Sequence, residues 1–208
     1  MCWSANSSIA SFIIGTIINI SVMLYLRSPV IYSICILWQW VLMMQLSEYF
    51  IWKDLDNKST NGLGTKMALI FNITQPLVGF LCLLLTSPAN LGFKITASII
   101  ILFYVSYMLL NFNKQNEYKS LNPSGKCKHM NLKWWHDIKN SGLIYCITLI
   151  SIILLILRPF KLSIFFSIFL IITFIISFVF YSCGGASMWC WFVVPFPIFL
   201  AIFYKFLM

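Results

Sequence analysis

The sequence predicts an all-α, polytopic membrane protein, a bundle of seven transmembrane helices, and three observations lead to this fold class. Seven apolar stretches, each about long enough to cross a bilayer, fill most of the 208 residues; a hydrocarbon core of about 30 Å takes roughly 20 helical residues. Charged residues make up 9% of the chain, against about 25% in soluble domains. The stretches are also too long for barrel strands, which need only about 9–11 residues of alternating polarity.

We expect one transmembrane domain over residues 1–208. Charged residues and prolines mark its boundaries: the first span stops at Arg27-Ser28-Pro29, the second ends at Lys53-Asp54, and the fifth is closed by Arg158-Pro159. Pro195 and Pro197 are expected to bend or end the last span. The expected spans are about 7–26, 30–52, 65–85, 92–112, 141–157, 162–182 and 186–204, with a polar loop over 113–139.

The net charge of +9 comes from lysines in the loops, which is typical of head-group contacts that anchor and orient a membrane protein. We therefore expect the bilayer as partner and no nucleic acid. An odd number of spans places the chain ends on opposite sides, and we call the N-terminal side "side A". Side A has more lysines, whereas the opposite short turns carry denser charge, so the sequence leaves the orientation and the oligomeric state open.

The cysteines and histidines predict neither a metal site nor a cofactor. The seven cysteines show no CxxC or Cys/His zinc spacing, and most fall in apolar runs, where a thiol packs as a small hydrophobe. The start of the chain, Met1-Cys2-Trp3-Ser4, has no basic region of the kind that opens a removable signal peptide. An integral, multi-pass location follows.

Polar residues inside the spans are the best internal indication of a site, because each needs a partner within the bundle. Gln45 and Glu48 share one face of the second span, and Glu48 is the one acid within any predicted span. Asn72 and Gln75 share a face of the third, where Pro76 frees the carbonyl of Asn72. Two interpretations stay open: helix–helix contacts, or a polar cavity reached from side A.

The loop segment Cys127–His136 interleaves basic residues with Trp134 and Trp135. This pattern favours an interfacial helix with its tryptophans at head-group depth. Alternatively, His129 and His136 act as ligands or proton carriers, because imidazole titrates near neutral pH.

Several motifs occur together in an order that resembles a known family. They are Met1-Cys2-Trp3-Ser4, the segment Met44–Trp52, Gln75-Pro76, the segment His129–Trp135 and Ser187-Met188-Trp189-Cys190-Trp191. The set is similar to an uncharacterised family of small multi-pass membrane proteins of giant DNA viruses and some protists. The resemblance covers essentially the whole chain and implies a host or virion membrane if the chain is viral, but it carries no activity.

The predicted topology brings these motifs to one face of the membrane, and we expect them to form one polar pocket on side A. Its expected members are Cys2, Gln45, Glu48, Asn72, Gln75, His129, Trp135 and Cys190.

Three functions of different class fit this pattern. The first is a transporter or channel-like protein for a small solute or ion, with a polar vestibule on side A. The second is a non-catalytic membrane or assembly protein. The third, an intramembrane enzyme, would use Glu48 with His129 or His136, or a nucleophilic Cys2 or Cys190. No catalytic residue is assigned, and an enzyme is the least favoured of the three.

The topology gives a first testable prediction. With seven crossings, tags on the two chain ends should differ in protection when protease is added to sealed vesicles. A cytosolic marker protein inside the vesicles controls for leakage. Equal protection of both tags would mean an even number of crossings and would remove the argument for a common side-A pocket.

Overall fold

The computed structural model describes residues 4–55, 58–122, 129–181 and 184–207. Over these residues the chain is helical and contains no strand, so the all-α prediction is confirmed. The helices are α1 (Ala5–Leu26), α2 (Pro29–Lys53), α3 (Lys58–Thr86), α4 (Leu91–Asn116), α5 (Lys133–Asp137), α6 (Ser141–Ile156), α7 (Phe160–Tyr181), α8 (Gly185–Phe192) and α9 (Phe196–Leu207).

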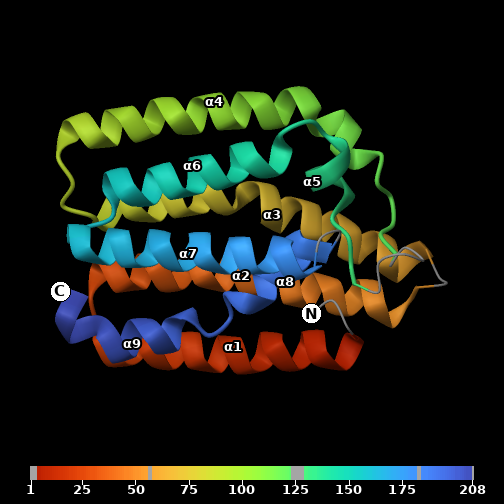
Figure 1. Ribbon diagram of the computed structural model, residues 1–208, viewed down its shortest axis with the longest axis horizontal. Helices are drawn as coiled ribbons and strands as arrows, with labels where there is room; N and C mark the ends of the chain where they lie inside the picture. Colours follow the sequence, from red (N-terminus) through yellow and green to blue (C-terminus); the bar gives the residue numbers. More distant parts are fainter. Residues whose placement is uncertain (1–3, 56–57, 123–128, 182–183, 208) are drawn as a thin grey trace.

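The long helices lie side by side and alternate in direction, so α1 begins and α9 ends at opposite ends of the bundle (Figure 1). Six segments of the described chain are long and apolar enough to cross a membrane, α8 and α9 counting together as one. The expected fifth span, α6, has only 16 residues and falls short of that length. Six candidate membrane-spanning segments are therefore present in the described chain, whereas the count of seven is not established.

Two elements differ from the expected spans. α3 begins at Lys58 rather than at residue 65; its first turns are held by contacts between Asn61 and the segment after α4. The expected seventh span is two helices, because α8 ends at Phe192 and α9 begins at Phe196. Pro195 lies in this break and lacks the backbone N–H that a continuous helix needs.

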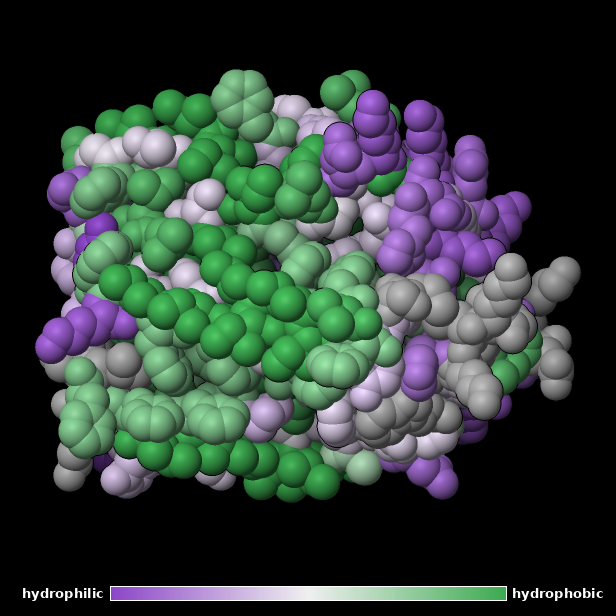
Figure 2. Space-filling view, viewed as in Figure 1, coloured by the Kyte–Doolittle hydropathy of each residue, from purple (hydrophilic) through white to green (hydrophobic). Residues whose placement is uncertain are grey.

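The surface has the polarity of a membrane protein. Figure 2 shows a broad apolar belt, with hydrophilic side chains gathered at the end of the bundle that carries α5. Exposed side chains of the belt include Ile13 of α1, Phe103 of α4 and Ile172 of α7. Such residues have no reason to face water in this number, and lipid is the solvent that suits them.

Polar side chains join α2 to its neighbours within this apolar bundle. Asn19 of α1 donates to the carbonyl oxygen of Cys35 over 2.8 Å. The indole of Trp40 donates to Thr74 Oγ1 of α3 over 2.8 Å, and the hydroxyl of Ser33 to the carbonyl oxygen of Cys82 over 3.0 Å. Asn19 therefore joins α1 to α2, as buried amides commonly do between membrane helices.

α2 and α3 approach each other closely at Gly64. A Cβ atom built on Gly64 would lie 2.8 Å from the carbonyl oxygen of Ser47 and 2.9 Å from the backbone nitrogen of Ile51. Backbone atoms of a packed helix cannot move aside as a flexible side chain can. The small residue therefore sets the distance between the two helices, as is common where membrane helices pack.

Gly64→Ala should consequently destabilise the protein by about 1–3 kcal/mol, the range for overpacking, even though alanine favours a helix by about 1 kcal/mol. The thermal midpoint in detergent should fall. Gly92→Ala is the matched control, since its Cβ would make an ordinary 3.6 Å contact with Asn90 Oδ1. Equal midpoints for the two variants would show that the α2–α3 distance is not limited by Gly64.

Candidate functional site

The side chain of Asn72 lies inside the bundle and accepts hydrogen bonds from two tryptophans. The indole nitrogen of Trp134 donates to Asn72 Oδ1 over 3.0 Å, and that of Trp135 donates to the same oxygen over 2.7 Å. An amide oxygen has two lone pairs, and an indole N–H can only donate. The two rings therefore use the full capacity of this oxygen and fix the orientation of the carboxamide.

Helix α5 carries both tryptophans into the bundle, where Trp134 is 1% exposed and Trp135 8%. The hydroxyl of Ser141 donates to the carbonyl oxygen of Trp134. The ring of Trp135 lies so close to Gly142 that a Cβ there would come within 2.7 Å of Trp135 Cε3. The two rings are thus inside the protein, where Asn72 is their acceptor. That they sit at head-group depth stays a prediction.

A second contact holds α5 at its outer edge. The hydroxyl of Tyr118, just after α4, donates to Asp137 Oδ2 over 3.0 Å. Burial, together with this hydrogen bond and the nearby negative charge of Asp137, raises the pKa of Tyr118 to about 12. Tyr118 therefore stays protonated at neutral pH and keeps its donor for Asp137.

The ring of Trp135 also belongs to an aromatic layer, which it forms with Tyr145 and Trp189. The Trp135–Tyr145 ring centroids are 5.1 Å apart, the Trp135–Trp189 centroids 6.1 Å and the Tyr145–Trp189 centroids 6.0 Å. The hydroxyl of Tyr145 donates to Gln75 Oε1, and the indole of Trp189 donates to Thr173 Oγ1 over 3.0 Å. The layer thus ties α3, α5, α6, α7 and α8 together.

A buried carboxyl group of α2, that of Glu48, also pairs with α8. The hydroxyl of Ser187 donates to Glu48 Oε1, and both Glu48 and Gln45 are 0% exposed. The second span therefore does turn these two side chains away from lipid, as their desolvation requires. Ser187, the partner of Glu48 in this hydrogen bond, belongs to α8.

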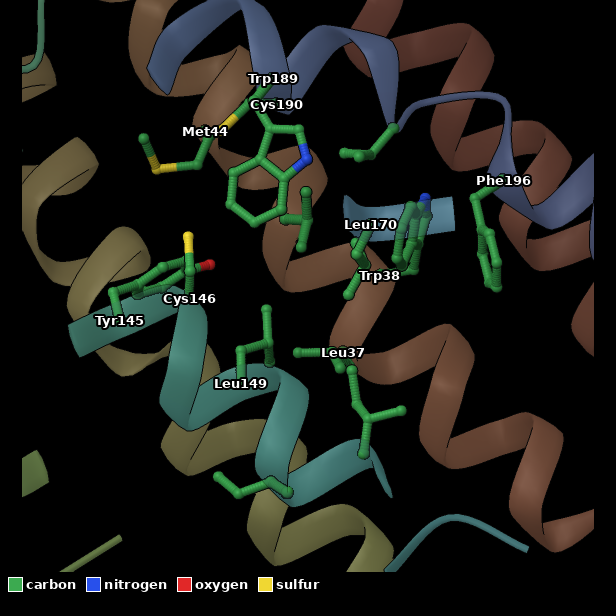
Figure 3. Packing of buried hydrophobic residues seen from close by; sticks show 14 of the residues in the cluster. Leu37, Trp38, Met44, Tyr145, Cys146, Leu149, Leu170, Trp189, Cys190 and Phe196 are labelled. Atoms are coloured by element: carbon green, nitrogen blue, oxygen red, sulfur yellow. The ribbon is translucent and has the colours of Figure 1, made fainter. Parts of the chain in front are cut away.

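A small cavity lies where α2, α3, α6, α7 and α8 meet, among the side chains drawn in Figure 3. It offers about 20 Å³ to the centre of a water molecule, which is room for about one. Its lining is mostly apolar and consists of Leu37, Trp38, Val41, Gln75, Tyr145, Leu149, Phe166, Leu170, Trp189, Cys190 and Val193.

Two of these lining residues carry a buried donor that is not engaged. The amide nitrogen of Gln75 and the indole nitrogen of Trp38 have no hydrogen-bond partner in the described part of the chain. Burying such a donor costs about 1–3 kcal/mol. Both of these unengaged groups beside the cavity are therefore donors.

The structure brings part of the predicted pocket together. Asn72, Gln75, Trp135 and Cys190 meet around the aromatic layer and the cavity. Glu48 approaches α8 at Ser187, a residue about 200° around the helix from Trp189 at 100° per residue. Gln45 is buried one turn before Glu48 on α2.

Among the other predicted members, His129 is placed at the junction between α7 and α8. The ring of His129 packs edge-on against Tyr181, with centroids 5.3 Å apart, and its Cβ lies against Gly184. His129 therefore sits at the α7–α8 junction. Cys2 lies outside the described residues.

Sequence reasoning missed three residues that complete the site. Tyr145 and Ser187 are the partners of Gln75 and Glu48, and Trp134 is the second donor to Asn72. Tyr145 could have been found, because it is a hydrogen-bonding side chain within an apolar span and needs a buried partner. Ser187 carries no such signal, since a serine in a membrane helix usually bonds within its own helix.

The described residues contain no group of three or more His, Cys, Asp or Glu side chains that could hold a metal ion. Comparisons with family models, with curated proteins and with solved structures found no match to this chain. The site must therefore be interpreted from its own geometry.

The contacts of Asn72 give a testable prediction. Asn72→Leu leaves two indole N–H groups buried without an acceptor, at about 1–3 kcal/mol each. The thermal midpoint should fall, and tryptophan emission should shift to the red as α5 leaves the bundle.

Asn111→Leu is the control, because the Asn111 amide donates only within its own helix, to the carbonyl oxygen of Tyr107 over 2.9 Å. If Asn72→Leu were as stable as Asn111→Leu and kept the emission of the native protein, the Asn72–indole contacts would not hold α5 in place.

Proposed function

We propose that this protein is a small transport protein of the membrane, transporter- or channel-like, whose path runs through the central cavity. The observation that carries the proposal is that cavity: five helices meet around it, and two of its lining residues hold unengaged donors. A purely structural core is expected to satisfy its buried polar groups. A donor beside a cavity instead favours a solute that brings an acceptor.

The proposal includes α6 as a seventh crossing. Its 16 residues rise about 24 Å at 1.5 Å per residue, somewhat less than a core of about 30 Å. α6 nevertheless lies alongside α7 over most of that helix (Figure 1). Short helices cross where neighbouring helices surround them or the bilayer thins.

A break between two helices and a proline within a third, both at the level of the cavity, support a transport path. Pro76 follows the lining residue Gln75 within α3. The α8–α9 break begins directly after Phe192, at the lining residue Val193. Transporters form their binding sites at interrupted helices near the middle of the membrane, and non-helical backbone is tolerated at that depth where protein or a cavity surrounds it.

Glu48 supplies the ionisable group that ion-coupled transport needs. An acid enclosed within a helix bundle is a candidate relay for protons or cations, and Glu48 is entirely buried. Its partner Ser187 lies one turn before Cys190 on α8. A change in the charge of Glu48 would therefore act on the helix that forms one wall of the cavity.

The polar vestibule on side A takes the form of a closed site in this proposal. Asn72 and Gln75 are each 2% exposed, and Trp134 and Trp135 occupy the space in front of Asn72. Helix α5 is the element that would have to move for a solute to enter from side A. The solute is a small molecule or ion with hydrogen-bond acceptors.

The other two functions receive less support. A non-catalytic assembly protein would need the same internal contacts but gives no role to the unengaged donors of Gln75 and Trp38. An enzyme using Glu48 with a histidine is not favoured, because His129 lies against Tyr181 and His136 is exposed. From the sequence motifs, we also propose that the chain belongs to the family that it resembles and that it lies in a host or virion membrane.

A test that needs no knowledge of the solute compares two buried native cysteines. Cys190 lines the cavity, whereas Cys35 of α2 does not; their exposures are 4% and 2%. Two variants, each keeping one of these cysteines and alanine at the others, would be treated in vesicles with an impermeant methanethiosulfonate reagent on either side. Mass spectrometry would follow the modification.

A transport path predicts that Cys190 reacts and that Cys35 does not. Protection of both would mean that the cavity never opens to water and would contradict transport. Equal reaction of both would indicate general loosening of the bundle, and it would also contradict a specific path.

A further inference from the structure

The outer surface between α3 and α4 has a polar mouth at side A. The mouth lies between the first turns of α3 and the segment that follows α4, and Lys66, Asn116, Lys119 and Ser120 line it. Both lysines are exposed, and neither ammonium group has an ion pair within the part of the chain that the structure describes. Two cations are therefore available to an anion there.

The mouth is held in place by a reciprocal contact. Asn61 Nδ2 donates to the carbonyl oxygen of Leu121 over 3.0 Å, and the Leu121 N–H donates to Asn61 Oδ1 over 3.1 Å. The Leu121 N–H also reaches Thr65 Oγ1 over 3.1 Å. Figure 1 shows the segment after α4 coming down to the start of α3. Because Leu121 is anchored, Lys119 and Ser120 are positioned beside α3 before any ligand arrives.

Deeper in the membrane, the same two helices enclose an apolar hollow. Leu77 of α3 and Val105, Leu109 and Phe112 of α4 form its walls; Leu109 is 69% exposed and Phe112 41%. Phe112 is about one turn from Asn116 of the mouth at 3.6 residues per turn. The hollow and the mouth thus lie along the same boundary between α3 and α4, and we call the two together the α3–α4 groove.

The polar groups within the deep hollow are already engaged. The hydroxyl of Tyr104 donates to the carbonyl oxygen of Ile73 over 2.8 Å. The hydroxyl of Thr74 donates to the carbonyl oxygen of Ile70 over 2.6 Å and accepts from Trp40. A ligand in this part of the groove meets only apolar surface.

We propose that the α3–α4 groove binds an anionic glycerophospholipid, with its phosphate between Lys66 and Lys119 and an acyl chain in the deep hollow. The dimensions agree: Lys66 to Leu77 is eleven residues along α3, about 16 Å, and one leaflet of the hydrocarbon core is about 15 Å. The pair of lysines selects a net negative head group over a zwitterionic one. This inference does not depend on transport.

Native mass spectrometry in detergent tests the proposal with two probes, phosphatidylglycerol and phosphatidylcholine of the same acyl chains. The native protein should retain phosphatidylglycerol in preference. Each lysine near an anionic lipid contributes about a fivefold factor. Lys66→Gln with Lys119→Gln should therefore weaken retention about 25-fold, and Leu109→Trp should weaken it by filling the hollow.

Lys133→Gln with Lys139→Gln is the matched control, since it removes the same charge at the same end of the bundle but outside this groove. Retention should stay at the native level in that variant. Equal retention of the two lipids, an equal loss in the control, or undiminished retention in Leu109→Trp would each overturn the proposal.

Discussion

The hydrogen bonds of Asn72 are the contact on which the architecture of side A depends. Helices satisfy their own backbone groups, so an apolar bundle can form without water, but buried side-chain donors still need acceptors. Asn72 Oδ1 is the acceptor for both indoles of α5. With both rings held there, the two tryptophans of α5 are buried in the bundle and Trp135 completes the aromatic layer.

The hydropathy of the sequence could predict the features that depend on the bilayer, namely the length of the spans and the burial of charged groups. Span length follows from membrane thickness, and most spans are found near their expected positions. The inward turn of Glu48 followed from the free energy of exposing a carboxyl group to lipid. The short α6 and the α8–α9 break depend on packing within the bundle, which a hydropathy profile does not contain.

The partners in the site could not be predicted for a related reason. Ser187 lies 139 residues from Glu48 in the chain, and Trp135 lies 63 residues from Asn72. From the sequence alone, tryptophans beside lysines are expected at a membrane surface, because the indole N–H can find a hydrogen-bond acceptor there. A buried acceptor on another helix is not visible in the local pattern. Only the three-dimensional arrangement reveals that Asn72 faces α5.

Helix α8 connects the two halves of the site through its opposite faces. Ser187 contacts Glu48 of α2, Trp189 contacts Trp135 and Tyr145, and Cys190 lines the cavity. The break before α9 frees this eight-residue helix from the constraint of a continuous span. If α8 moved as a unit, the contact of Glu48 and the packing of the aromatic layer would change together. By linkage, any ligand or charge that favours one position of α8 at Glu48 favours the matching position of the layer. In the proposed transport mechanism, the charge of Glu48 on one face of this short helix would in this way act on the aromatic layer at its other face.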